Sequence, residues 1–281
     1  MSDRPILVLG ATGGQGGAVA AALLTRGMPV RAMARQPDKP SAQRLAERGV
    51  DVVAGSLDDP AAIGAAMRGV DAVFALTTPF ETGVDAELTQ GRAILTAAVE
   101  AQVPHIVFSS VASADQHTGV PHFESKAIVE KELVSTGLPY TIVGPTYFFD
   151  NALGGMDRIR AGILDLPLPP DRPLHQLARS DMGAFVAKVL RDPKPYVGQR
   201  IDLASDAVTP RRMAEVLSEA LGRSVRHDQT PLESIRSPDM LAMWRFLNGP
   251  GYRVDIEVLR DENPDIAWTS FADWVLRAVS E

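Results

Sequence analysis

The sequence predicts a doubly wound α/β fold, in which helices cover both faces of a parallel sheet and a small C-terminal α/β lobe follows. Short apolar stretches alternate with helical ones through residues 1–150, and several are continuously apolar, as in strands buried on both faces. After about residue 150 the chain becomes rich in glycine and proline. We therefore expect a sheet domain over 1–150 and a smaller lid lobe over 151–281, interleaved with the sheet rather than folding alone.

The elements of the first half can be placed in order along the chain. Helices are expected over 18–24, from Asp59-Pro60, where a cap residue precedes a first-turn proline, and over 85–102. Strands alternating with helices at this rhythm imply right-handed crossovers and a doubly wound sheet. The expected strands are 6–9, 30–34, 51–54, 72–76, 105–108 and 140–143.

The second half carries fewer periodic patterns. Residues 151–180 are expected to form a long irregular segment, of the kind used for binding loops or lids. A helix over 181–190, a strand over 201–204 and a helix over 210–221 should follow. We interpret the apolar stripe Met240, Met243, Trp244 and Leu247 as packing rather than as a cofactor site. This lobe should lean over the strand ends, where ligands bind in open α/β sheets.

Composition excludes several classes of function. The chain has 281 residues, 45% of them hydrophobic, with a net charge of −7 and no cysteine. The acidity argues against nucleic-acid binding, and the missing cysteines exclude disulfides, thiolate nucleophiles and cysteine metal sites. Without a membrane-spanning stretch or room for a signal peptide before Pro5, we expect a cytoplasmic protein, monomeric or homodimeric, that contains no metal.

A glycine-rich turn after the first strand predicts a dinucleotide site. Gly10 permits the tight turn, Gly13 lets the backbone approach a pyrophosphate, and Gly16 lets the helix pack closely on the strand. The N–H groups at the helix start then face the anion. The alternative is a glycine-rich loop of no special function, but the order strand, turn, helix favours the nucleotide.

Two basic residues after the second strand specify which dinucleotide is expected. The residue that closes this strand meets the adenosine ribose, and an acidic side chain there would favour NAD. Here Arg35 occupies the position, and Lys39 is close by. A planar guanidinium suits a 2′-phosphate, so the sequence predicts NADP(H) as the cofactor.

The usual tyrosine of short-chain dehydrogenases, four residues before a lysine, occurs nowhere in this chain. After the fifth strand stand His122, Lys126 and Glu130, spaced by four and therefore on one helix face. Lys126 could bind the nicotinamide ribose, or act as a proton donor if burial and neighbouring positive charge lower its pKa. His122 could donate in either protonation state. The alternative is a solvated helix face with a Lys126–Glu130 ion pair.

The residues that end the other strands should also lie near the cofactor. Ser109 and Ser110 end the fifth strand near the expected nicotinamide, although serines are also common in turns. Aromatic residues after the sixth strand could wall a substrate pocket or pack in the core. Further contacts to ribose, phosphates and substrate are expected from Thr77, Thr78, Pro79, Pro145, Tyr147 and Phe148.

Taken together, these stretches resemble the NmrA-like branch of atypical short-chain dehydrogenases, and within it the HSCARG-type NADPH-sensing proteins. The resemblance covers nearly the whole chain. It rests on 9–20, Arg35 with Lys39, 55–59, 122–130, 145–151, 180–183, 196–199 and 243–246. It implies a Rossmann-type domain that binds NADP(H), with cofactor contacts that include Thr12, Gln15 and Leu57.

The resemblance implies two alternative functions. Some members transfer hydride from NADPH to quinones, imines, enals or carbonyl compounds, several using a lysine at the position of Lys126. Others bind NADP(H) and regulate a protein partner without known turnover. Two departures matter: Ser56 stands where members usually carry aspartate, and the segment 167–173 is unusually rich in proline, so the substrate preference cannot be carried over.

Overall fold

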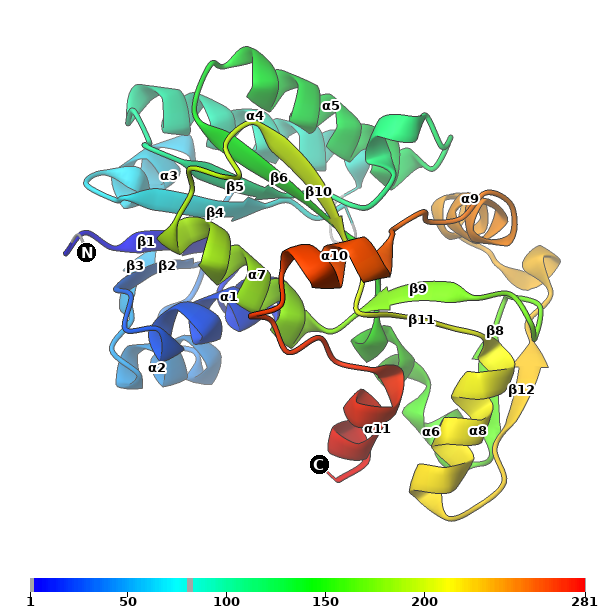
Figure 1. The fold of residues 1–281 in the computed structure, drawn as a ribbon. Coiled ribbons are helices and arrows are strands. Elements are labelled where there is room, and N and C mark those ends of the chain that lie inside the picture. The colour runs from blue at the N-terminus through cyan, green and yellow to red at the C-terminus, as the bar shows by residue number, and fades with distance from the viewer. Residues whose placement is uncertain (1–2, 80–82, 281) are drawn as a thin grey trace.

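The computed structural model describes residues 3–79 and 83–280, and its largest element is a seven-stranded sheet. The strand order is β10-β6-β5-β4-β1-β2-β3 (Figure 1). Every pairing is parallel, so the strands all end at the same edge. The strands are β1 (Ile6–Leu9), β2 (Val30–Ala34), β3 (Asp51–Ala54), β4 (Ala72–Leu76), β5 (Ile106–Ser109), β6 (Tyr140–Pro145) and β10 (Gln199–Leu203).

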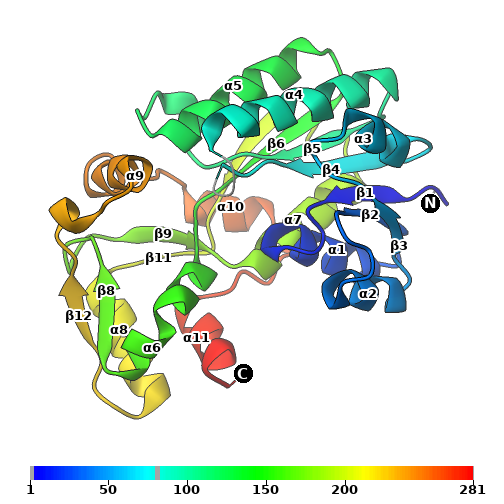
Figure 2. The same ribbon diagram turned by 180° about the vertical axis from the view of Figure 1, so that it is seen from behind.

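Helices cover both faces of this sheet, as opposite views of the molecule show (Figures 1 and 2). Side chains of a single strand alternate between the two resulting cores: Ile6 and Val8 lie in one, Leu7 and Leu9 in the other. This is why the strand sequence is continuously apolar. One face packs against α1 (Gly14–Thr25), α2 (Pro40–Glu47), α7 (Arg179–Arg191) and α10 (Ile256–Glu262), and the other against α3 (Pro60–Met67), α4 (Val84–Glu100) and α5 (Pro121–Ser135).

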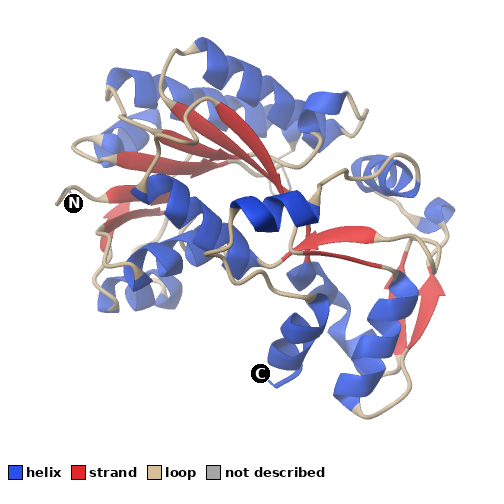
Figure 3. Ribbon diagram, viewed as in Figure 1, coloured by secondary structure: helices blue, strands red, loops and turns tan. Residues whose placement is uncertain are grey.

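A smaller lobe with its own hydrophobic core lies beside the sheet, and its strands form a separate group (Figure 3). One sheet has the order β11-β9-β7, and the other pairs β12 with β8. The elements are β7 (Tyr147–Phe148), β8 (Ile163–Leu166), β9 (Leu174–Leu177), β11 (Asp206–Val208), β12 (Arg226–Gln229), α6 (Met156–Arg160), α8 (Pro210–Leu221), α9 (Pro238–Asn248) and α11 (Phe271–Ser280). No helix in the described part of the chain is long and apolar enough to span a membrane.

The predicted fold class is confirmed, with two corrections to the second half. The stretch 151–180 is not irregular throughout, because it contains α6, β8 and β9. These strands pair with residues far along the chain, β8 with β12 and β9 with β11, and local sequence does not reveal such partners. The strand expected over 201–204 is β10, and it joins the main sheet beside β6. A domain boundary near residue 150 stays a prediction.

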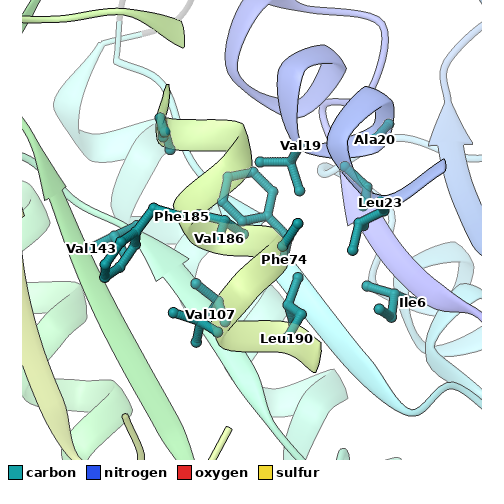
Figure 4. Close-up of a cluster of buried hydrophobic side chains, with 14 of the residues drawn as sticks. Ile6, Val19, Ala20, Leu23, Phe74, Val107, Val143, Phe185, Val186 and Leu190 are labelled. Atoms are coloured by element: carbon teal, nitrogen blue, oxygen red, sulfur yellow. The ribbon is translucent and has the colours of Figure 1, made fainter. Parts of the chain in front are cut away.

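Close packing of α7 on α1 attaches the second half to the sheet. A Cβ added to Gly183 would lie 2.5 Å from the backbone oxygen of Ala18, so only glycine allows this approach. Val19 and Leu23 of α1 meet Phe185 of α7 in the adjoining core (Figure 4). Nearby, Asp181 accepts hydrogen bonds from the hydroxyls of Ser205 and Thr269 and from the backbone N–H of Thr269. The segment 180–183 therefore holds separate parts of the chain together.

We predict that Gly183→Ala lowers the free energy of unfolding by about 1–3 kcal/mol, because the added methyl group overpacks a contact between two backbones. Gly64 is the matched control, since it also lies within a helix but has nothing within 4 Å of its Cβ position. Gly64→Ala should leave the stability unchanged or raise it, because alanine favours the helix. Urea denaturation measures both. Equal effects of the two substitutions would contradict this account of the α1–α7 contact.

Candidate functional site

A cavity of about 770 Å³ lies at the carboxyl ends of the main-sheet strands and extends under the smaller lobe. This is where open α/β sheets bind ligands, and the volume is typical of a ligand pocket. The residues after β1, β2, β4, β5 and β6 all contribute to its wall. The lining is 10, 12–16, 33–35, 55–58, 76–79, 90, 110–111, 122–123, 126, 145–148, 151, 179, 240, 243–244 and 252.

The glycine loop between β1 and α1 forms the floor of the cavity. A Cβ at Gly16 would lie 2.4 Å from the backbone oxygen of Gly10, so the helix start can approach the strand only without a side chain. The first turn of α1 contains no acidic residue, so the positive end of the helix dipole there is suited to an anion. Gln15 ties the loop to the sheet, because its Oε1 accepts a 2.8 Å hydrogen bond from the Ser109 hydroxyl.

Beside this cavity, Arg35 and Lys39 line a second hollow of about 380 Å³. Thr12, Gln36 and Ser41 contribute to it as well, and no carboxylate stands among the described residues of its lining. Arg35 lines both cavities. Two cations with hydroxyl and amide groups around them are suited to a phosphate group.

A buried ion pair stands behind the middle of the cavity. Lys126 Nζ lies 2.9 Å from Glu87 Oε1 and donates a 3.0 Å hydrogen bond to the backbone oxygen of Thr77. The Glu87 carboxylate is fully buried, and it also accepts hydrogen bonds from the hydroxyls of Thr77 and Ser125. The group beside the Lys126 ammonium is therefore a carboxylate, and not the neighbouring positive charge that the proton-donor role was expected to need.

The alternative that α5 presents a solvated face with a Lys126–Glu130 ion pair is wrong. His122, Lys126 and Glu130 share one face as their spacing predicts, but all three are buried. Glu130 does not pair with Lys126. Instead its carboxylate accepts hydrogen bonds from the Ser110 hydroxyl and from Arg200, whose Nε lies 3.0 Å from Oε2. The partners of Lys126 and Glu130 come instead from α4 and β10.

His122 is joined to the smaller lobe through α9. Its Nδ1 lies 2.8 Å from the Asp239 carboxylate, which also accepts a 3.0 Å hydrogen bond from the His122 backbone N–H. Burial lowers the pKa of His122, although Asp239 opposes this shift. A carboxylate only accepts, so Nδ1 carries the proton, and Nε2 of the neutral ring is an acceptor. In the neutral ring Nδ1 is thus occupied by Asp239, and Nε2 could donate to a ligand only in the protonated ring. A role of His122 as a donor stays a prediction.

The part of the cavity under the smaller lobe has an aromatic wall. The rings of Tyr147 and Trp244 are 5.6 Å apart, and those of Phe123 and Tyr252 are stacked at 6.1 Å. Met240, Met243 and Trp244 of α9 line the same wall, although Met243 and Trp244 also pack in the core as predicted. Burial raises the pKa of the Tyr147 hydroxyl to about 12, so this group remains a neutral hydrogen-bond donor.

The predicted site residues mostly gather around the main cavity. Two do not line it: Lys39 faces only the smaller hollow, and Ser109 is buried against Gln15, while Ser110 lines the wall. The prolines of 167–173 also lie outside it, so the proline-rich stretch does not form its lid. The predicted residues that line the main cavity are Gly10, Thr12, Gly13, Gln15, Gly16, Arg35, Leu57, Thr77, Thr78, Pro79, His122, Lys126, Pro145, Tyr147 and Phe148.

Sequence reasoning missed three charged residues at this site. Glu87 and Asp239 are partners of Lys126 and His122, and Arg179 lines the cavity beside the glycine loop. Glu87 is 39 residues from Lys126 along the chain, so no local spacing could reveal the pair. Glu87 does lie in the first turn of a predicted helix, where an acidic residue is ordinary.

Comparison with known proteins gives one family and several relatives. The model of the NmrA-like family matches residues 2–274. A (4-alkanoyl-5-oxo-2,5-dihydrofuran-3-yl)methyl phosphate reductase of Streptomyces griseus is 30% identical over 236 residues, 83% of this chain and 79% of that protein. An NAD(P)H azoreductase of Xenophilus azovorans is 31% identical over 232 residues, which cover 82% and 79% of the two chains.

Among solved structures, the triphenylmethane reductase of Citrobacter sp. complexed with NADP(H) superposes with a TM-score of 0.83. The match covers 98% of this chain and 99% of that one, at 21% identity. This likeness confirms the fold over the full length, including the smaller lobe.

We predict that Glu87 and Lys126 stabilise the fold as a coupled pair. Glu87→Gln should lower the free energy of unfolding by about 3–5 kcal/mol, because it leaves a buried ammonium without its counter-charge. Removing both charges in Glu87→Gln/Lys126→Met should cost less than the sum of the single substitutions. Denaturant unfolding of the four proteins measures this difference.

The matched control is Glu132→Gln, which breaks the exposed pair with Arg92 and should have a much smaller effect. Equal losses at positions 87 and 132, or strictly additive losses at 87 and 126, would contradict the coupling.

Proposed function

This chain belongs to the NmrA-like family, and on that basis we propose that it is an NADPH-dependent oxidoreductase that reduces a small organic substrate. One observation carries the proposal. A single cavity is lined by the glycine loop and Arg35, by the buried Lys126, and by the aromatic side chains Tyr147, Trp244 and Tyr252. Cofactor and substrate would thus occupy adjoining parts of the same space.

The residues around the cavity fit NADP(H). The glycine loop and the N-terminus of α1 would bind the pyrophosphate, which requires the close approach that Gly16 allows. Arg35 and Lys39 would bind the 2′-phosphate in the smaller hollow. The relatives support this, since the Xenophilus azovorans enzyme is named for NAD(P)H and the Citrobacter structure contains NADP(H).

Lys126 would hold the ribose next to the nicotinamide. Its Nζ is held by Glu87 and by the Thr77 backbone oxygen, and its third contact, to the Thr77 hydroxyl, is long at 3.5 Å. A hydroxyl in the cavity would take the place of that weak third contact. Because Nζ is already fixed by Glu87 and the Thr77 backbone oxygen, we assign Lys126 to binding and orientation rather than to proton donation. The cofactor, when bound, supplies a hydride from C4 of the nicotinamide.

Tyr147 would polarise the substrate atom that gains negative charge. Its hydroxyl stays protonated because burial raises its pKa to about 12, and it stands on the cavity wall. Water would supply the proton that completes the reduction. The wall around Tyr147 is aromatic and methionine-rich, which favours a planar, largely apolar substrate such as a quinone, enal, imine or carbonyl compound.

We predict that the purified protein oxidises NADPH in the presence of at least one member of a panel of quinones, enals, imines and aldehydes. Lys126→Ala should abolish this turnover because the ribose is no longer held, while NADPH still binds. Lys131→Ala, an exposed lysine on the same helix, should leave the rate unchanged. Nicotinamide absorbance measures turnover, and calorimetry measures binding.

Full turnover in Lys126→Ala would contradict the role of the lysine. Tight NADPH binding by the native protein without turnover of any panel member would favour the regulatory function found elsewhere in the family.

We predict that Arg35→Gln reduces the affinity for NADPH by about 10- to 100-fold, because a charge-assisted contact to the 2′-phosphate is lost. The affinity for NADH, which lacks that phosphate, should not change. Arg44→Gln removes the same charge from an exposed position of α2 outside both hollows and should affect neither cofactor. Equal losses for NADPH and NADH in Arg35→Gln would contradict the assignment.

A further inference from the structure

Arg179 lies directly over the glycine loop, although it comes from the second half of the chain. A Cβ added to Gly14 would lie 2.6 Å from Cζ and from Nη1 of Arg179, so the guanidinium rests against the start of α1. Arg179 is the first residue of α7, and the contact of Gly183 with α1 holds that helix in place. The side chain also lines the main cavity.

The hydrogen-bonding capacity of this guanidinium is not fully used by the described residues. Asp150 Oδ1 lies 3.4 Å from Nη1, longer than the 2.7–2.9 Å or so of a tight charge-assisted hydrogen bond. The Phe148 ring centroid lies 5.8 Å from Cζ. Nε is buried and makes no hydrogen bond within the described residues. A buried N–H donor without an acceptor is costly, and an anion in the cavity would supply the acceptor.

We propose that Arg179 binds the pyrophosphate of the cofactor and, through Asp150 and Phe148, links cofactor binding to the segment 147–155 that walls the substrate. This rests on the proposed function for the identity of the cofactor. The pyrophosphate carries two negative charges, and the glycine loop offers backbone N–H groups and the neutral side chains of Thr12 and Gln15, but no positive charge. Arg179 adds a full positive charge and a forked donor at that point. The same guanidinium contacts both halves of the site.

The binding part of the proposal is tested by calorimetry with NADPH, NADH and 2′-AMP, which carries the 2′-phosphate but no pyrophosphate. Arg179→Gln should reduce the affinities for NADPH and for NADH by the same factor, about 10- to 100-fold. Its affinity for 2′-AMP should not change, which also shows that the variant is folded. Arg35→Gln should give a different pattern, in which the affinities for NADPH and 2′-AMP fall and the affinity for NADH does not change.

Arg160→Gln is the matched control, because it removes an exposed arginine outside the cavity and should change none of the three affinities. The proposal would be overturned if Arg179→Gln bound NADPH with unchanged affinity, or if its affinity for 2′-AMP fell as much as its affinity for NADPH. Either result would leave the proposed function intact. A native protein that does not bind NADPH would overturn both.

The link to the substrate wall is tested by hydrogen exchange of the backbone amides of 147–155 at saturating cofactor. NADPH should slow this exchange in the native protein but not in Arg179→Gln, because the guanidinium is the group that joins Asp150 to the bound anion. Equal protection in the two saturated proteins would overturn the link.

Discussion

The contact between α1 and α7 is the constraint on which the site depends. The first helix starts at the glycine loop, and the seventh comes after the first strands of the smaller lobe. Their backbones approach so closely at Gly183 and Ala18 that any side chain would separate them. This contact holds Arg179, the first residue of α7, over the glycine loop. After α7 the chain returns from the smaller lobe to β10 at the edge of the main sheet. Cofactor and substrate regions are therefore built on one shared packing interface.

Buried charges complete the site, and each is matched by a partner from a different part of the fold. Lys126 meets Glu87 of α4, Glu130 meets Arg200 of β10, and His122 meets Asp239 of α9. Three residues on one helix face thus bind three separate elements. Such pairs are costly to form but strongly destabilising to break, so they specify one arrangement of α5 against its neighbours. The proposed role of Lys126 follows from this, since its geometry is set before any ligand arrives.

Features that depend on neighbouring residues could be predicted from sequence, and those that depend on distant pairing could not. The glycine loop and the position of Arg35 follow from strand, turn and helix signals within one unit of the chain. The spacing of Lys126 and Glu130 favoured a pair that does not form, because helical spacing says nothing about the helix packed alongside. Strands β8 and β9 were not predicted, because the strands that pair with them lie far along the chain. The contribution of α9 to the cavity wall was not predicted either, because it depends on how the smaller lobe packs.

In the function that we propose, NADPH transfers a hydride directly to a substrate that lies against the aromatic wall. This transfer is tested most directly with NADPH that carries deuterium at the transferred C4 position, incubated with an enal, imine or aldehyde that supports its oxidation and accepts the hydride at carbon, where the label does not exchange with water. Mass spectrometry of the reduced product should find one deuterium per molecule, because the hydride moves directly between two ligands in a shared cavity. A product without deuterium, formed while NADPH is consumed, would contradict the account.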